Sequence, residues 1–278
     1  MGNQLDNLLT VVIPVKNEEK NLPACLDNVK TVKNVVVVDS GSTDRTLAIA
    51  REYNREVVQF DWTGEFPKKR NWMLRNYKFK TPWVFFLDAD ELPGVKFWKE
   101  LSVVLPYTSH DVFVIYLNNW FMGRILRHGD TPRKTAIVRL GHAEYERIEE
   151  SDWSKLDMEI HEHLISLGTV GRIRTPIDHF DKRSLSSYYA KHNEYSDWES
   201  GRFEILAGNL SNGLTIRQRL KYRFLMNKFF PYAYFIYTYI LRLGFLDGTP
   251  GYYFAINKFN QFNQLQAKII ERRMAVRR

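Results

Sequence analysis

Residues Trp83–Glu91 read WVFFLDADE, five apolar residues followed at once by an acidic turn. An unbroken apolar run rich in aromatic and β-branched residues is typical of a strand buried on both faces of a parallel sheet. Two more runs have this character, LTVVIPV at Leu9–Val15 and NVVVV at Asn34–Val38, and Asp39 directly follows the second. We therefore predict three buried strands with polar residues at their carboxyl ends.

Helical patterns separate these strands. Apolar residues between Leu22 and Val29 recur at the i, i+3, i+4 and i+7 spacing of an amphipathic helix. TLAIAREY follows DSGSTD, in which Ser42 or Thr43 is a candidate helix cap. A short strand is expected over Val57–Phe60 and a helix over Lys68–Asn76. Alternating strands and helices predict the α/β class with a mostly parallel sheet.

The organisation changes further along the chain. We expect one domain over residues 1–212, with a nucleotide-binding half to about residue 110 and an acceptor half from about 111 to 212. The second half contains strand-like runs at Val112–Leu117 and Lys134–Leu140 and a predicted helix over Ser184–Arg202. Residues 213–278 form a separate helical region.

Positive charge is concentrated in that last region. The 278 residues carry a net charge of +8, yet residues 213–278 alone contain twelve Lys and Arg against two acids. Within them, Phe229–Leu241 reads FFPYAYFIYTYIL between basic residues. Such a segment fits the headgroup level of an anionic membrane, and a core helix with a solvated basic face is the alternative. Nucleic acid is a weaker reading, because the usual recognition motifs are absent.

Other global features narrow the class of protein. No apolar run reaches the ~18 residues that span a bilayer, and the first residues lack the pattern of a signal peptide. The single cysteine, Cys25, excludes an internal disulfide and fits a reducing cytosol. Its position on an apolar helical face predicts a core residue.

The polar turns at the strand ends suggest how a nucleotide is held. Neither GxGxxG nor GxxxxGK[ST] is present. The alternative is a divalent ion, Mn²⁺ or Mg²⁺, bound by one or two carboxylates and a substrate diphosphate. Asp88 and Asp90 are the predicted metal ligands, although paired aspartates also occur as solvated turn residues.

At this point the chain resembles the family 2 glycosyltransferases with the GT-A fold. IPVKNEEKNL, VVVVDSGSTDRTLAIA and WVFFLDADE are similar to the three N-terminal motifs of that family. FMGRILRHGD, IHEHL, IDHFDKRSLSSYYAKHNEYS and LRLGFLDG resemble the branch of lipopolysaccharide-core β-1,4-glucosyltransferases. The resemblance implies an inverting transferase that uses a nucleotide-diphospho sugar, often UDP-glucose, and a divalent metal.

The resemblance also assigns roles to individual residues. Asp39 would accept a hydrogen bond from the imide N–H of uracil, and Asp90 would bind the metal. Family members often have Tyr at the position of Lys16. The nucleotide-sugar contacts implied by the resemblance fall on Pro14, Lys16, Glu18, Asp39, Asp88 and Ala89.

Catalysis requires two further groups. In FPKKRNW, Arg70 is the favoured contact to the diphosphate, because a guanidinium binds phosphate oxygens in pairs. Candidate bases cluster in Asp157–His163, and the resemblance places the His–Glu pair of the branch at His161 and Glu162. We predict Glu162 as the general base. His161 or His179 could complete a metal shell, but a structural histidine is the commoner case.

The sequence thus favours a metal-dependent inverting glycosyltransferase. It would move a hexose, glucose in the first instance, from a UDP-sugar to a lipid-anchored glycan at the cytoplasmic face of the inner membrane. One alternative keeps the fold and changes the acceptor to a polyprenyl phosphate. Another, of a different class, is a non-catalytic membrane adaptor that retains a degenerate nucleotide site.

Overall fold

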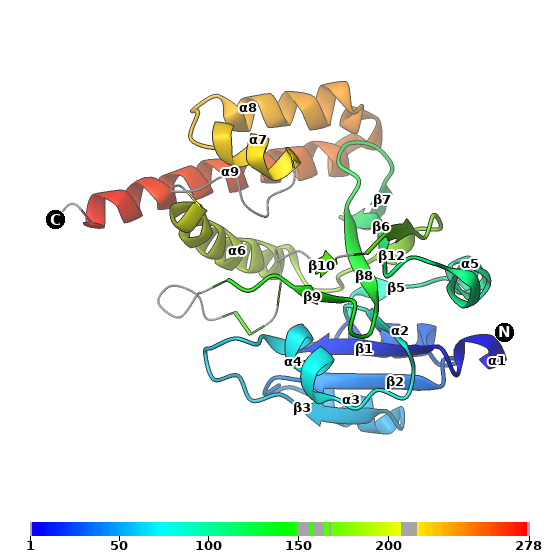
Figure 1. Cartoon of the computed structure of the whole chain (residues 1–278). Coiled ribbons are helices and arrows are strands. Elements are labelled where there is room, and N and C mark those ends of the chain that lie inside the picture. The colour runs from blue at the N-terminus through cyan, green and yellow to red at the C-terminus, as the bar shows by residue number, and fades with distance from the viewer. Residues whose placement is uncertain are drawn as a thin grey trace. The chain divides into compact units, whose positions relative to one another are not determined.

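The computed structural model describes residues 2–148, 156–157, 159, 164–166, 168–206 and 216–276 (Figure 1). The chain divides into two compact units. The first comprises residues 1–120, 131–151 and 155–182, and the second comprises residues 121–130, 152–154 and 183–278. The predicted domain boundary at residue 212 lies outside the described residues and stays a prediction.

The first unit is built on a parallel sheet. Its strands β1 (Leu9–Val15), β2 (Asn34–Asp39), β3 (Glu56–Gln59) and β4 (Trp83–Phe86) follow the spatial order β3-β2-β1-β4. All neighbouring pairs among them are parallel, with Val15 opposite Asp39 at the carboxyl ends of β1 and β2. The predicted buried strands are therefore confirmed, each within about one residue of its expected bounds.

The sheet continues with strands from later in the chain. Beyond β4 the order is β8 (Arg133–Arg139), β6 (Val112–Phe121), β12 (Ile177–His179) and β5 (Glu91–Leu92). β8 is antiparallel to β4 and β6, whereas β12 and β11 (Val170–Arg172) run parallel to β6. β9 (Ala143–Tyr145) and β10 (Leu164–Ser166) form a separate antiparallel pair. The sheet is mixed but mostly parallel, as predicted.

Helices connect the strands. They are α1 (Gly2–Leu5), α2 (Leu22–Asn28), α3 (Thr46–Glu52), α4 (Lys69–Asn76), α5 (Val95–Val104) and the 3₁₀ turn η1 (Leu105–Tyr107). One detail corrects the sequence analysis: neither Ser42 nor Thr43 caps α3. The Asp44 carboxylate instead accepts the Thr46 N–H at 2.9 Å, because Asn17 engages both Ser42 and Thr43.

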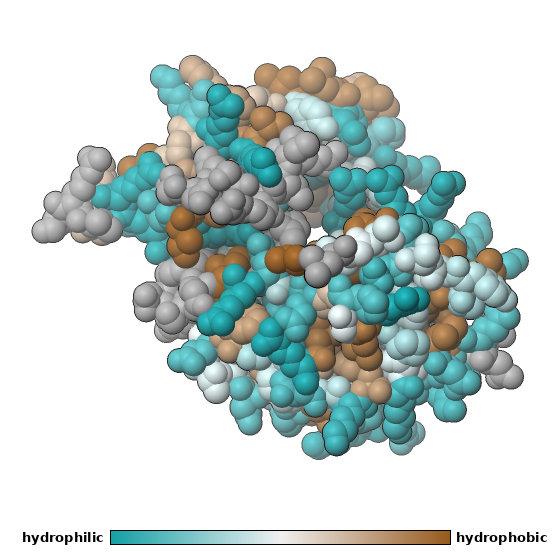
Figure 2. Space-filling model, viewed as in Figure 1, coloured by the Kyte–Doolittle hydropathy of each residue, from teal (hydrophilic) through white to brown (hydrophobic). Residues whose placement is uncertain are grey.

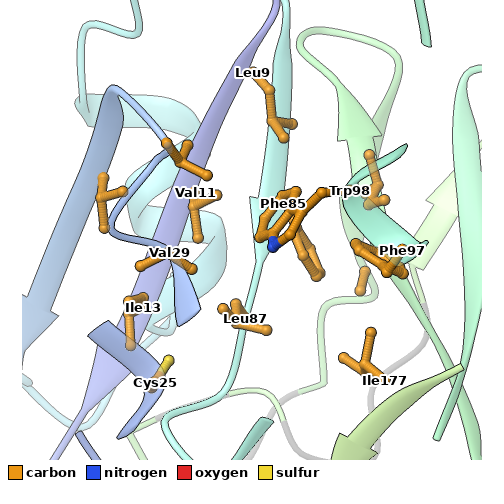
Figure 3. Packing of buried hydrophobic residues seen from close by; sticks show 14 of the residues in the cluster. Leu9, Val11, Ile13, Cys25, Val29, Phe85, Leu87, Phe97, Trp98 and Ile177 are labelled. Atoms are coloured by element: carbon orange, nitrogen blue, oxygen red, sulfur yellow. The ribbon is translucent and has the colours of Figure 1, made fainter. Parts of the chain in front are cut away.

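The alternation of side chains along each strand divides the core into two clusters. In β1, Val11, Ile13 and Val15 face one cluster and Val12 faces the other. Figure 3 shows the first cluster, in which Phe85 packs against Phe97 and Trp98. Burial on both faces explains why the strands contain hardly any polar residue.

Cys25 lies in the same cluster, as predicted, and is fully buried. Burial raises the pKa of its thiol well above the ordinary value. Since the thiolate is the reactive form, Cys25 is a packing residue.

The second unit is helical apart from the short strand β7 (Arg124–Leu126). Its elements are α6 (Leu185–Leu206), α7 (Ile216–Phe224), α8 (Phe230–Phe235), the π-helix η2 (Ile236–Leu241), the 3₁₀ turn η3 (Gly244–Asp247) and α9 (Gly248–Val276). Phe203, Tyr222, Leu225, Phe262, Leu265 and Ile269 form a buried hydrophobic cluster in this unit. None of the helices in the described ranges is long and apolar enough to cross a bilayer. The predicted α/β class with a C-terminal helical region is confirmed.

Candidate active site

Charged residues meet at one edge of the parallel sheet. β1, β2 and β4 are parallel neighbours, so their carboxyl ends at Val15, Asp39 and Phe86 lie on the same side. In open α/β sheets this is the edge where ligands bind. The site is built from the turns that follow these three strands.

The turn after β2 is organised by Asp39. Its fully buried carboxylate accepts the Gly41 N–H at 2.9 Å, the Ser42 N–H at 3.1 Å and the Ser42 hydroxyl at 2.5 Å. Gly41 has a φ of +83°, a conformation that favours glycine. The structure thus shows Asp39 bonded to its own turn.

The turn after β1 lies beside it. Pro14 is buried opposite Val38, whereas Lys16 is exposed. The Glu18 N–H donates to Thr46 Oγ1 at 2.8 Å, and the Glu18 carboxylate accepts from Asn21 at 2.8 Å. The first bond fixes the chain that follows β1 against the start of α3, and the second ties it to the residue before α2.

The acidic turn after β4 contains an ion cluster. Both oxygens of Asp88 are engaged at 2.6 Å, Oδ1 by Arg70 and Oδ2 by Lys134 of β8. Lys134 also contacts Glu91 at 2.8 Å, and the Glu91 carboxylate accepts the Asp88 N–H at 3.0 Å. Ala89, between the two aspartates, is buried.

The charges of this cluster shift one another's protonation. Burial alone would raise the pKa of Asp88, but the charges of Lys134 and Arg70 outweigh it and hold that pKa well below its ordinary value. Burial raises the pKa of Glu91 to about 7, against the opposing charge of Lys134. The Asp88 carboxylate is therefore ionised at neutral pH.

Arg70 is held from the other side by Glu159. The Glu159 carboxylate accepts the backbone N–H groups of Arg70 and Asn71, both at 2.9 Å, and caps the first turn of α4. The Arg70 guanidinium also donates to the Glu159 carbonyl at 2.5 Å. Arg70 is thus fixed in the site by its backbone and its side chain.

Lys69 ties the same helix to the first strand. Its ammonium donates to the Val15 carbonyl at 2.9 Å and lies 3.0 Å from the Asp157 carboxylate. Asp157 also accepts a hydrogen bond from Ser40. Burial lowers the pKa of Lys69 despite the charge of Asp157. Lys69 therefore connects α4 to the end of β1, and Asp157 connects Lys69 to the turn after β2.

Asp90 lies next to a histidine. His179 Nε2 on β12 is 3.4 Å from Asp90 Oδ2, and His179 Nδ1 is 3.4 Å from Asn119. The Phe180 N–H donates to the Asp90 carbonyl at 2.7 Å, which holds the two segments together. A carboxylate oxygen and an imidazole nitrogen at this separation are both donors that Mn²⁺ accepts.

Within the described ranges, no group of three or more His, Cys, Asp or Glu side chains is arranged around a common ion position. An ion held by Asp90 and His179 would need further ligands from water and from a substrate diphosphate, which is how Mg²⁺ and Mn²⁺ commonly bind at phosphate sites. Asp88 could contribute only by exchanging one of its two cationic partners.

The structure brings together most of the predicted site residues. Asp39 at the end of β2, Arg70 on α4 and Asp88, Ala89 and Asp90 after β4 lie at one sheet edge, with Pro14 near the end of β1 and Lys16 and Glu18 on the turn that follows it. Glu162 and His161 lie outside the described residues, so their roles stay predictions.

Sequence reasoning missed Lys134 and assigned no roles to Glu91 and Glu159. Glu91 extends the acidic turn, so its position was a usable signal. Lys134 had none, because it starts a strand-like run far along the sequence, and only the pairing of β8 with β4 brings that strand to the site.

Comparison with known proteins gives a family match. Residues 10–123 match the sequence model described as Glycosyl transferase family 2. The lipopolysaccharide core biosynthesis glycosyltransferase LpsC of Rhizobium meliloti is 28% identical over 205 residues, covering 68% of each chain. An uncharacterized glycosyltransferase of Rickettsia bellii is 24% identical over 274 residues, covering 96% of this chain and 88% of its own.

Solved structures give weaker likenesses. S. aureus TarS 1–349 aligns over 96% of this chain and 92% of its own, with 16% identity and a TM-score of 0.44. Glucosyl-3-phosphoglycerate synthase from Mycobacterium tuberculosis aligns over 42% of this chain with 22% identity and a TM-score of 0.32. The match spans 45% of that synthase chain, less than half of its length.

Proposed function

We propose that this chain, whose residues 10–123 match the family 2 glycosyltransferases, transfers a hexose, glucose in the first instance, from a UDP-sugar to a hydroxyl of a lipid-anchored glycan. The observation that supports this most is the meeting of Asp88, Asp90 and Arg70 with the Asp39 turn at one sheet edge. Lipopolysaccharide core is the favoured acceptor, because LpsC carries that description and aligns with two thirds of the chain.

In this proposal the turns after β1 and β2 hold the nucleoside. Pro14, Lys16 and Glu18 line one side of the pocket, and Asp39 receives the imide N–H of uracil. Since Asp39 already accepts three N–H and O–H groups of its own turn, receiving the imide N–H requires the exchange of one of these bonds. Asp88 and Ala89 face the ribose and the diphosphate.

Asp90 and His179 would hold Mn²⁺ or Mg²⁺, and Asp88 would be the second carboxylate of that site once it exchanges one of its two cationic partners. When bound, the ion supplies an electrophilic partner for the leaving diphosphate. The chain's own cations add to this neutralisation. Arg70 and Lys134 lie 2.6 Å from Asp88, and both are positioned to interact with phosphate oxygens at the same turn.

The acceptor hydroxyl must lose its proton as it attacks the anomeric carbon. We assign this role to Glu162. Asp157 and Glu159, the neighbouring candidates, are engaged by Lys69 and by the first turn of α4. Because both are buried in structural contacts, they are poorly suited to take up a proton from an acceptor.

A lipid-anchored acceptor would place the enzyme at the cytoplasmic face of the inner membrane.

The decisive experiment is a screen of sugar nucleotides by mass spectrometry, with Mn²⁺, with Mg²⁺ and with a chelator. We expect metal-dependent turnover of a UDP-hexose, lost in Asp90→Ala. Asp178→Asn is the matched control, because Asp178 lies beside His179 but bonds Asn118. Turnover by Asp90→Ala equal to the wild type would refute the assignment, and parallel incubations with lipopolysaccharide core and polyprenyl phosphate identify the acceptor.

A further inference from the structure

The second unit exposes an apolar surface next to basic side chains. We define the aromatic-aliphatic surface as the exposed apolar side chains between residues 229 and 253, which are Phe229, Tyr232, Ile236, Tyr237, Ile240, Leu241, Leu243, Phe245, Leu246, Tyr252 and Tyr253. Leu241 is 68% exposed and Leu246 is 56% exposed. In Figure 2 hydrophobic atoms, in brown, gather along the upper edge, over the segment labelled α8 in Figure 1.

This exposure is not a sign of loose packing, because the opposite side of the same segment is well ordered against α9. Phe230 and Tyr234 contact Phe262 edge to face, with ring centroids 5.0 and 4.8 Å apart. Thr238 is buried and donates to the Tyr234 carbonyl at 2.9 Å. The segment therefore keeps one apolar face in the core and presents a second to the surroundings.

The exposed positions follow a helical stripe. Phe229, Tyr232, Ile236 and Ile240 recur at spacings of three and four residues, so they share one face of the continuous helical segment formed by α8 and η2. Exposed apolar patches of this kind mark interaction sites. A helix in water gains nothing from an apolar stripe on its outer face.

The charges within residues 228–246 all have one sign. Lys228 precedes the stripe and Arg242 follows it, and no acid occurs between Phe229 and Leu246. Asp247, the next acid along the chain, is mostly buried, with a side chain that is 7% exposed. Its carboxylate accepts the backbone N–H groups of Arg127 and His128. Asp130, which lies three residues after Arg127, accepts a hydrogen bond from the Tyr234 hydroxyl at 3.0 Å.

The loop that engages Asp247 adds further cations. The Gly129 N–H donates to the Arg242 carbonyl at 2.9 Å, and Arg242 Nε donates back to the Gly129 carbonyl at 3.2 Å. This pairing holds the exposed Arg127 close to η3. A stripe of Tyr, Phe, Ile and Leu bordered by Arg and Lys matches a bilayer interface, where rings sit among headgroups and cations meet lipid phosphates.

We propose that the aromatic-aliphatic surface docks this enzyme on an anionic lipid bilayer, with Ile236, Ile240 and Leu241 inserted at the interface. The proposal rests on the proposed function, since a lipid-anchored acceptor requires the enzyme to work at a membrane. The docking proposal goes beyond that function because it identifies the residues that contact the membrane.

The test uses the whole 278-residue chain and co-sedimentation with vesicles of phosphatidylcholine, with and without phosphatidylglycerol. Wild type should bind the anionic vesicles more tightly and release from them at high salt. The triple variant Ile236→Ser/Ile240→Ser/Leu241→Ser should bind at least about tenfold more weakly. The control Val95→Ser/Val103→Ser removes exposed aliphatic side chains of α5 in the first unit and should bind as wild type does.

Two further readouts separate the possible failures. Circular dichroism checks that the triple variant is folded, and turnover of the UDP-sugar in detergent-free solution should be unchanged. Vesicle binding unaffected by the triple substitution would overturn the proposal, as would a wild-type dimer that the triple variant breaks while vesicle binding persists. If the triple substitution leaves vesicle binding unchanged while turnover is intact, the docking proposal is refuted and the proposed function stands. Absence of turnover in the wild type refutes the proposed function itself.

Discussion

The Nη2 atom of Arg70 lies 2.6 Å from the Oδ1 atom of Asp88. Arg70 belongs to the first turn of α4 and Asp88 to the turn after β4, so the pair joins two separate elements of the site. The Arg70 side chain is 8% exposed, and it contacts Glu159 and the ring of Tyr145 as well. This one cation therefore supports three parts of the site at once.

Removal of that cation should destabilise the fold. Arg70→Met leaves Asp88 and the Glu159 carbonyl without a guanidinium partner, and breaking a buried pair from one side costs about 3–5 kcal/mol, with the lower end expected because Asp88 is partly exposed. Urea unfolding measures this. Arg75→Met is the matched control, since its pair with Glu144 is exposed on both sides and should cost less than about 1 kcal/mol. Equal losses in the two variants would contradict this account.

Loss of His179 should weaken metal binding. His179→Ala removes the imidazole 3.4 Å from Asp90, and we expect the affinity for Mn²⁺ in the presence of UDP to fall at least about tenfold. Isothermal titration calorimetry measures this affinity directly, without requiring turnover. The control Asn118→Ala alters the neighbouring strand only. Unchanged Mn²⁺ affinity in His179→Ala would leave the imidazole a structural role.

Substitution of the predicted base should act on the chemical step. Glu162→Gln keeps the shape of the side chain but cannot accept a proton, so kcat should fall by roughly 10²–10⁴. KM for the UDP-sugar should change little, because the group acts on the acceptor. Glu144→Gln, an exposed carboxylate paired with Arg75, should retain wild-type kcat. A Glu162→Gln enzyme with normal kcat would move the role to another residue.

Acid should weaken the link between α4 and the β-strand turns. Burial alone would raise the pKa of Asp157, but the charge of Lys69 and the hydroxyl of Ser40 outweigh it and lower that pKa below its ordinary value of 3.8. A lowered pKa contributes stability that is fully present above the unfolded-state pKa and is lost as the pH falls through the folded-state pKa. The free-energy gap between wild type and Asp157→Asn should therefore begin to shrink below about pH 5 and be smaller at pH 3. A gap that stays constant in urea unfolding over this range would argue against the ion pair.

The aromatic centre of the first core cluster should tolerate truncation poorly. Phe85 is fully buried between Phe97 and Trp98, with ring centroids 5.6 and 6.1 Å away. Phe85→Ala leaves a cavity and should cost about 3–5 kcal/mol. Phe85→Leu, which keeps most of the apolar volume, should cost clearly less. Thermal unfolding of the two variants makes the comparison, and similar losses would show that the site collapses around either change.

Local patterns were sufficient for much of the fold. Three strands are buried on both faces, so almost all their residues are apolar and their strand character can be predicted from composition alone. They are Leu9–Val15, Asn34–Asp39 and Trp83–Phe86. The helix caps could not be predicted from the sequence in the same way. Ser42 looked like a cap by residue type, but Asn17 competes for it from a turn 25 positions earlier, and no local pattern contains that contact.

The sequence by itself determined the parallel strands, the acidic turns that follow them and the basic, aromatic character of the C-terminal region, because each depends on neighbouring residues and their periodicity. Only the tertiary structure decided the partners of those turns. Lys134 reaches Asp88 because β8 pairs with β4, and His179 reaches Asp90 because β12 pairs with β5. Such pairings join residues far apart in the chain, and the energy that selects them comes from burial of the whole sheet rather than from any one segment.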